Sequence, residues 1–186
     1  KIASIHDLNQ IKEAYQADFG RYKHQILLCA GAGCISCDCY KVRDAVVAEL
    51  EAQGLTDSVK LIETGCIGTC ALGSVLLILP ERTFYVQVTP EKVPQIIKSH
   101  IVDGVVAEKF TFHNKLTGEY IPTIDHIPFF KEQVRIALRN CGAIEYSSLD
   151  AYIANGGYYG AEKALTTMSP KDVVDEVKAP GLRGRG

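Results

Sequence analysis

The chain has 186 residues, 47% of them hydrophobic, and a formal net charge of −2. This length allows one ordinary domain with its own core and a smaller second unit. Acidic and basic residues are mixed along the chain, which argues against nucleic acid or an anionic membrane as the main partner. The longest apolar run, "VLLIL", is too short to span a membrane, and the N-terminus lacks a signal-peptide pattern. We therefore expect a protein of the cytoplasm, without a membrane span and without a nucleic-acid partner.

The first elements in chain order read as helix, strand and helix. Apolar residues recur at helical spacing within residues 5–20, which predicts an amphipathic helix that ends at Gly20. The run "HQILLC" predicts a buried strand. After a cysteine-rich loop, "YKVRDAVVAELEAQG" places Val42, Val46 and Leu50 four residues apart, with Gly54 where a helix ends.

Three short strands and a helix follow. The runs "SVKLIETG", "SVLLILP" and "TFYVQVT" predict strands, the last two joined by a tight turn at Pro80. The run "TPEKVPQIIKSHI" predicts a helix with Thr89 as its N-cap and Pro90 in its first turn. This order predicts an α/β fold in which helices pack on a mixed sheet, the thioredoxin-like arrangement.

The remaining chain divides into a linker and a helical part. Periodicity weakens over residues 105–127, which predicts an extended linker with a small hairpin at "NKLTG". Helices are predicted in "PFFKEQVRIALRNCG", in "SSLDAYIANGG" with Ser147 and Asp150 as a capping box, and in "SPKDVVDEVK" with Ser169 as N-cap. We expect an N-terminal helix over 1–20, a sheet domain over 21–104, a linker over 105–127 and a helical segment over 128–186.

Seven cysteines, four of them within residues 29–39, suit metal binding or redox chemistry better than a disulfide framework. Cys34 and Cys37 form C-x-x-C between a strand and a helix, as in thioredoxin-like oxidoreductases. That interpretation gives no role to Cys29 or to the second cluster, "TGCIGTC". A dinucleotide-binding turn in "GAGCIS" is set aside, because Ser36 stands at the third glycine position.

The two cysteine clusters are expected to meet. Loops that follow two parallel strands of a β-α-β unit leave the sheet at the same edge. Four thiolates would then come together there, from Cys29, Cys34, Cys66 and Cys70. Such a set can hold a structural zinc or an iron–sulfur cluster. Neighbouring glycines and the wide x4 and x3 spacings favour a [2Fe–2S] cluster, with zinc as the alternative.

The other candidate ligands receive ordinary structural interpretations. Cys37 and Cys39 are expected in the first turn of the helix as packing groups, with ligand exchange into the cluster as the alternative. Cys141 is expected as a small core residue at a helix end. The histidines show no mutual spacing that indicates a site; they are His6, His24, His100, His113 and His126.

The motifs "CAGAGC" and "TGCIGTC", followed by "VTPEKVPQIIKSHI", resemble the thioredoxin-like [2Fe–2S] ferredoxin domain. That domain occurs in the 24-kDa subunit of NADH dehydrogenases. The resemblance covers about residues 25–106 and implies that Cys29, Cys34, Cys66 and Cys70 are the cluster ligands. Cys37 and Cys39 are extra thiols relative to the motif.

The segment from "RIALRNCG" to "GLRGRG" resembles the start of the 51-kDa subunit that binds NADH and FMN. The resemblance implies that the glycine-rich end opens the loop around the flavin phosphate, with five candidate residues: Gly181, Arg183, Gly184, Arg185 and Gly186. Backbone N–H groups and arginines suit such an anion. FMN, NAD(P) and a [4Fe–4S] cluster are implied for parts of a longer polypeptide beyond Gly186.

A ferredoxin domain in front of a flavin subunit resembles the β subunit of soluble NAD(P)-linked [FeFe]-hydrogenases, including electron-bifurcating ones. The implied function is single-electron transfer through the cluster to other iron–sulfur and catalytic subunits of such a complex. The chain by itself is expected to carry electrons without a catalytic site of its own and without NADH oxidation. Two alternatives remain, a thiol–disulfide oxidoreductase using Cys34 and Cys37, and a module of a complex I-type NADH:quinone oxidoreductase.

Overall fold

The computed structural model describes residue 2 and residues 4–184. Contacts divide these residues into two compact units. Residues 18–147 form the larger unit, and the described residues before 18 and after 147 form the smaller one. Within the described part of the chain, no helix combines the length and apolar character needed to cross a membrane.

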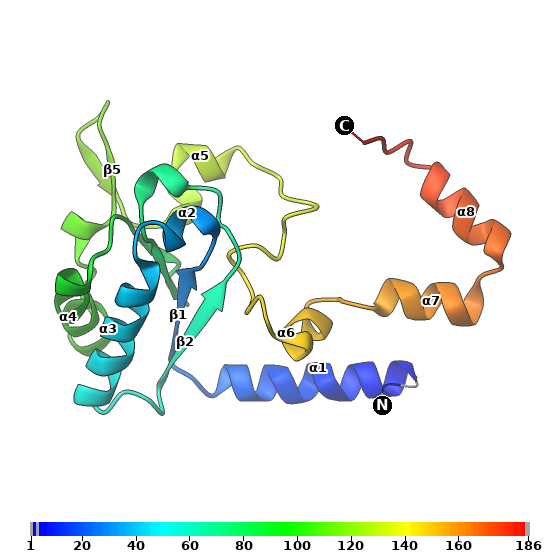
Figure 1. Cartoon of the computed structure of the whole chain (residues 1–186), viewed down its shortest axis with the longest axis horizontal. Coiled ribbons are helices and arrows are strands. Elements are labelled where there is room, and N and C mark those ends of the chain that lie inside the picture. The colour runs from blue at the N-terminus through cyan, green and yellow to red at the C-terminus, as the bar shows by residue number, and fades with distance from the viewer. Residues whose placement is uncertain (1, 3, 185–186) are drawn as a thin grey trace. The chain divides into compact units, whose positions relative to one another are not determined.

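The larger unit is built on a four-stranded sheet with the strand order β2-β1-β3-β4 (Figure 1). Its strands are β1 (His24–Cys29), β2 (Val59–Thr64), β3 (Leu76–Leu79) and β4 (Thr83–Tyr85). β1 and β2 are parallel, whereas β3 runs antiparallel to β1 and to β4. The predicted mixed sheet and the predicted hairpin at Pro80 are therefore confirmed.

Strand β1 lies in the middle of the core. All six of its residues are buried, which explains why its sequence is a continuous apolar run rather than an alternating one. Helix α3 (Cys39–Ala52) crosses from β1 to β2 and buries Val42, Val46 and Leu50, the predicted stripe. The helix ends at Ala52 with Gln53 as its C-cap, and Gly54 follows with a φ of 65°, the left-handed conformation that glycine adopts without strain.

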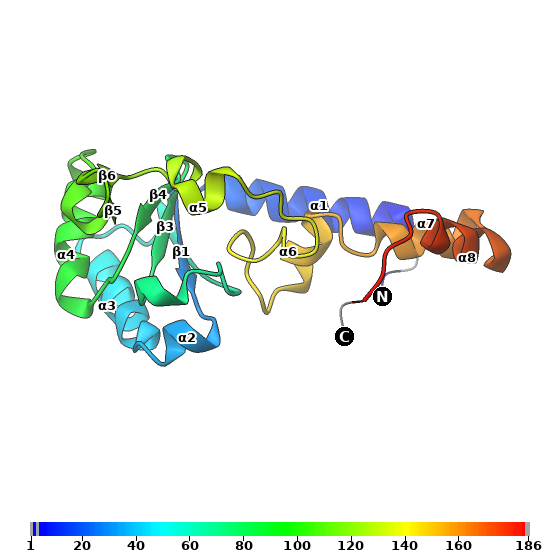
Figure 2. The same cartoon turned by 90° about the horizontal axis from the view of Figure 1, so that it is seen from above.

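Both sides of the sheet are covered. Helix α4 (Val93–Ile96) continues a 3-10 turn at Pro90–Lys92 and runs into a π-helical stretch, Ile97–Val102. Ile96, Ile97 and Ile101 are buried as predicted, although the helix is less regular than expected. Helix α5 (Pro128–Lys131) lies on a different side of the strands from α3 (Figure 2). There Phe130 packs edge-on against Phe84 of β4, with ring centroids 5.7 Å apart.

Residues 105–127, predicted as an extended linker, pack against the sheet. They contain the predicted hairpin, formed by β5 (Phe112–Asn114) and β6 (Glu119–Ile121). Isolated bridges join Tyr85 to Thr111 and Thr83 to Thr123, and Ile124 is buried in the core. The segment thus covers the edge strand β4, whose open backbone groups would otherwise face solvent.

The prediction of one helix from Pro128 to Gly142 is wrong. Only the four residues of α5 are helical at its start, and turns follow. The apolar residues Val134, Ile136 and Leu138 are 88%, 80% and 62% exposed. They are spaced two apart, so they cannot form one face of a helix that would be stabilised by burial.

The smaller unit is helical. It contains most of α1 (Ile5–Gly20), together with α6 (Leu149–Ala154), α7 (Tyr159–Thr167) and α8 (Pro170–Lys178). The N-cap of α6 is Ser148 rather than the predicted Ser147, and its hydroxyl accepts a hydrogen bond from the Ala151 N–H at 3.1 Å. Ser169 forms the predicted cap of α8. Helix α7 was not predicted from the sequence.

Candidate functional site

The site lies at the edge of the sheet where β1 and β2 end. Cys29, the last residue of β1, is the register partner of Thr64, the last residue of β2. The Ala30 N–H donates to the Thr64 carbonyl at 2.9 Å just beyond this pair. The two cysteine-containing loops therefore leave the sheet side by side, as the sequence predicted.

The first loop turns at once into the short helix α2 (Ala32–Ile35), which holds Cys34. Cys29 and Cys34 are buried, with 2% and 3% of their surface exposed. The Cys34 thiol donates to the Gly73 carbonyl at 3.5 Å, so it is tied to the far end of the second loop. These two thiols form the inner half of the site.

The second loop presents its cysteines at the surface. Cys66 and Cys70 are both exposed, and the loop turns at Gly68, where φ is 98°. Cys70 begins a 3-10 turn, Cys70–Leu72, that leads to Gly73. The four thiols together thus span from the core to the surface.

Two glycines of the first loop allow the second loop to approach. A Cβ atom at Gly31 would lie 2.8 Å from Cβ of Cys66, and one at Gly33 would lie 2.8 Å from Sγ of Cys70. Both distances are shorter than nonbonded atoms tolerate. The backbone of the first loop therefore contacts both exposed cysteines directly at Gly31 and Gly33. Any side chain at these two positions would occupy the space that Cys66 and Cys70 fill.

Burial raises the pKa of the Cys34 thiol, and the neighbouring Cys29, Cys39 and Cys70 thiols add to the shift. At Cys66 the largest single influence, a hydrogen bond from the Gly68 backbone, lowers the pKa. Partial burial and the Cys29 and Cys70 thiols outweigh it, so the net shift is upward. Thiolate ligands must be deprotonated, so loading this site with metal displaces protons from the thiols.

These raised pKa values also bear on the C-x-x-C interpretation. A thiol oxidoreductase needs an accessible cysteine whose pKa is lowered. Cys34 is buried and its pKa is raised by that burial, while Cys37 lies exposed in the turn after α2. The geometry at Cys34 does not favour thiol–disulfide exchange.

Electrostatic interactions link the four thiols across the two loops: Cys34 interacts with Cys29 and Cys70, and Cys66 interacts with Cys29 and Cys70. Among the residues that the structure describes, no three cysteine, histidine or carboxylate side chains are placed as ligands of one metal ion. A [2Fe–2S] cluster is held by four cysteine thiolates across two irons. Four thiols on two loops in close contact fit that arrangement.

The remaining cysteines surround this set. Cys39 is fully buried at the start of α3, and Cys37 is exposed in the turn before it, outside the predicted helical turn. Cys141, predicted as a core residue at a helix end, is only half-buried. Its Sγ lies 3.8 Å from the position of a Cβ at Gly65. No pattern in the sequence indicated this proximity, because Cys141 and Gly65 are far apart along the chain.

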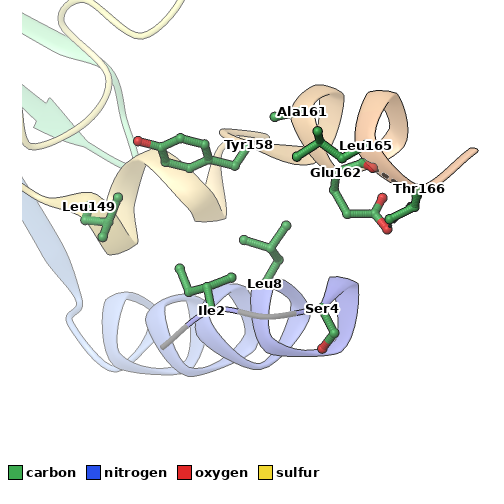
Figure 3. A pocket seen from close by; sticks show the side chains of 9 residues that line it. All are labelled: Ile2, Ser4, Leu8, Leu149, Tyr158, Ala161, Glu162, Leu165 and Thr166. Carbon is green, nitrogen blue, oxygen red and sulfur yellow. Dashed lines mark hydrogen bonds between the residues drawn. The ribbon is translucent and has the colours of Figure 1, made fainter. Parts of the chain in front are cut away.

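Of the residues suggested for a flavin phosphate, Gly181, Arg183 and Gly184 lie in the smaller unit. Gly181 has a φ of 62°, and Arg183 and Gly184 are exposed without regular structure. Arg185 and Gly186 lie outside the described residues. The same unit has an apolar hollow of about 500 Å³, lined among others by Leu8, Leu149 and Tyr158 (Figure 3). It contains no cysteine and has no part in the cysteine site.

A mixed sheet with four cysteines at one edge fits the class of thioredoxin-like iron–sulfur carriers. Comparison with known families agrees: the family described as thioredoxin-like [2Fe–2S] ferredoxin matches residues 13–100. The chain is also 30% identical over 95 residues to the 2Fe-2S ferredoxin of Clostridium pasteurianum. The aligned region covers 47% of this chain and 93% of that protein. The chain belongs to the thioredoxin-like [2Fe–2S] ferredoxin family, whose cofactor is the [2Fe–2S] cluster.

Other relatives are larger proteins. The chain is 61% identical over 56 residues to the NADP-reducing hydrogenase subunit HndC of Solidesulfovibrio fructosivorans, which is 30% of this chain and 11% of that protein. It is 55% identical over 38 residues to a subunit of the NADH-quinone oxidoreductase of Escherichia coli (strain K12), 20% of this chain and 8% of that protein. The chain thus spans about a tenth of the length of these two relatives.

Proposed function

We propose that Cys29, Cys34, Cys66 and Cys70 bind the [2Fe–2S] cluster and that the chain passes single electrons through it. The observation that carries this assignment is the close contact of two glycines with two cysteines. The backbone at Gly31 and Gly33 approaches Cys66 and Cys70 too closely for a side chain to fit between them. Such close backbone approach supplies the N–H groups that hydrogen-bond to cluster and cysteine sulfurs.

The cluster supplies a one-electron redox couple. The protein determines which side of the cluster is exposed to solvent and to a redox partner. Cys29 and Cys34 would hold it from the buried side, where the core excludes water. Cys66 and Cys70 would hold it at the surface, within reach of a redox partner. The chain's own residues therefore orient the cluster and limit its solvent contact, and they make or break no bond of a substrate.

We further propose that the chain is part of an NAD(P)H-linked flavin and iron–sulfur complex. Its likeness to a subunit of an NADP-reducing hydrogenase and to a subunit of an NADH-quinone oxidoreductase supports a place in an NAD(P)-linked redox complex. The preferred setting is a soluble hydrogenase of the electron-bifurcating kind, rather than a complex I-type enzyme. In this proposal Gly181, Arg183, Gly184, Arg185 and Gly186 open the flavin-phosphate loop. FMN, NAD(P), a [4Fe–4S] cluster and the partner subunits belong to the longer assembly.

Anaerobic purification, iron and sulfide analysis, and electron paramagnetic resonance after reduction test the cluster assignment. We expect two irons and two sulfides per chain, as the cluster's formula requires. Replacing Cys66 or Cys70 by Ser should abolish or strongly reduce the resonance signal, because each removes one thiolate ligand.

Cys37→Ser is the matched control, since it also removes an exposed thiol near the site. It should leave iron content and the signal unchanged. A protein with zinc and no iron, or equal cluster loss in Cys37→Ser and Cys66→Ser, would contradict the assignment.

A further inference from the structure

A hollow with positive charge lies beside the second cysteine loop. It has a volume of about 270 Å³ and is bordered by the turn after Cys70, the end of β4 and the β5–β6 hairpin. We call it the basic hollow and define it by Lys92, Lys109, Lys115, Phe110 and Tyr120. None of its described lining residues is a carboxylate.

No carboxylate among the described lining residues balances the charge of the three lysines inside the hollow. Within the part of the chain that the structure describes, none of them takes part in an ion pair. Lys92 donates to the Gln87 carbonyl, a neutral acceptor, at 2.7 Å. Lys109 and Lys92 also lie over the Phe110 ring, 4.9 and 5.7 Å from its centroid. Contact with an aromatic face positions an ammonium group without neutralising it, so the hollow attracts negative charge.

The basic hollow is close to the proposed cluster. Leu72 lines it and lies two residues after Cys70, so the backbone separates the two by no more than about 7 Å. The Gln87 N–H donates to the Leu72 carbonyl at 2.8 Å, which ties the far wall to the cysteine loop. A molecule held in the hollow is therefore next to the exposed half of the cysteine site.

Exposed apolar side chains of the β5–β6 hairpin lie beside the basic hollow. The hairpin that contains β5 extends away from the sheet (Figure 1). Its turn carries Leu116, which is 96% exposed, and Tyr120 on β6 is 45% exposed. Tyrosine is enriched in protein interfaces, where aromatic anchors lie within a polar rim, and the exposed leucine adds apolar surface beside it. A small anion would make no use of the leucine, which lies in the turn.

We propose that the basic hollow and the hairpin turn dock the acidic face of a redox protein that exchanges electrons with the cluster. The inference rests on the proposed function, because docking here matters only if Cys70 belongs to a cluster site. Charge complementarity would speed the encounter, and Leu116 and Tyr120 would anchor the complex.

The test uses the full-length protein with Lys109→Glu and Lys115→Glu combined. Both side chains are exposed, so their reversal should leave the fold intact. The matched control reverses Lys23 and Lys131, which are also exposed but lie outside the hollow. Leu116→Ser tests the apolar anchor without any change of charge.

The reduced protein is mixed anaerobically with oxidised flavodoxin, an acidic one-electron acceptor, and the cluster absorbance is followed by stopped flow. One electron leaves the cluster and enters the flavin, which takes a proton from water. We expect the double reversal to slow the bimolecular rate by about tenfold or more at low ionic strength, with a smaller difference at high salt. Leu116→Ser should also slow it, and the Lys23 and Lys131 control should match the wild type.

Two outcomes would overturn the docking proposal while the proposed function stands. The first is an equal bimolecular rate for the double reversal and its control. The second is that the double reversal slows electron transfer to ferricyanide as much as it slows transfer to flavodoxin. The second would show a general attraction of anions rather than docking of a protein face. A wild-type protein without any resonance signal, in contrast, would overturn the proposed function itself.

Discussion

Two residues without side chains set how closely the cysteine loops approach. Gly31 and Gly33 are not in left-handed conformations, so their backbone angles would accept any residue. What requires glycine there is space, because Cys66 and Cys70 fill the volume that a Cβ would occupy. The constraint is therefore one of packing against the proposed cluster ligands.

Gly33→Ala should reduce cluster retention. Its added Cβ would lie 2.8 Å from Sγ and 2.9 Å from Cβ of Cys70, so the second loop must move away. Iron content after purification and the rate of cluster loss on exposure to a chelator measure this effect. Gly160→Ala in α7 is the control, because a Cβ there meets nothing within 4 Å. Equal retention in the two variants would show that the close approach is not needed.

A buried histidine predicts a pH dependence of stability. His100 is 3% exposed, and its Nδ1 lies 3.0 Å from the Tyr85 hydroxyl, which accepts from the Ala107 N–H. Burial is the main cause that lowers the pKa of His100. Glu81 opposes the shift, and His24 adds to it. Burial likewise raises the pKa of Tyr85 to about 12, so its hydroxyl stays neutral.

Because the folded-state pKa of His100 is lowered, the unfolded chain binds this proton more readily. The stability that neutral His100 contributes is present above about pH 6.5, its ordinary value, and is lost as the pH falls from there through the lowered folded-state pKa. Thermal unfolding should therefore occur at lower temperature at pH 5 than at pH 8, and His100→Gln should narrow that difference. An unchanged pH dependence in His100→Gln would assign the effect to other groups.

Among the secondary-structure elements, a capped helix end and a continuous apolar face distinguish the predicted helices that form from the one that does not. α8 has a capping box in which the Ser169 hydroxyl accepts from the Asp172 N–H and the Asp172 carboxylate accepts from the Ser169 N–H. The segment after α5 has apolar residues at 134, 136 and 138, which no helical face can bury together. It forms turns, although its composition resembles that of a helix.

Ser169→Ala should destabilise α8 by about 1 kcal/mol, because the Asp172 N–H in its first turn loses the hydroxyl that accepts its hydrogen bond. Hydrogen exchange followed by mass spectrometry should show faster exchange in Pro170–Lys178 and unchanged exchange in β1. Thr167→Ala provides the control, since that residue precedes the cap. Exchange in α8 as slow as in the wild type would mean that contacts other than the cap hold this helix.

Across the molecule, the two compact units differ from the predicted domain boundaries. The larger unit runs to residue 147 because residues 105–147 pack on the sheet, through Ile124, Ile127 and the contact of Gly142 with Ile67. The boundary at residue 104 stays a prediction about where the ferredoxin-type domain ends. The contacts show in addition that residues 105–147 cover the edge strand β4 and reach the second cysteine loop at Ile67.

Local patterns in the sequence were enough to predict the sheet, the crossover helix α3 and the meeting of the two cysteine clusters. Hydrophobic periodicity is a local signal, and the parallel arrangement of a β-α-β unit fixes where its loops emerge. Three further features became known from the folded chain alone: Cys141 lies beside Gly65, Gly31 and Gly33 touch Cys66 and Cys70, and lysines from separate segments share one hollow. These contacts join residues far apart in the chain, and they depend on packing between elements, which no local pattern of residues encodes.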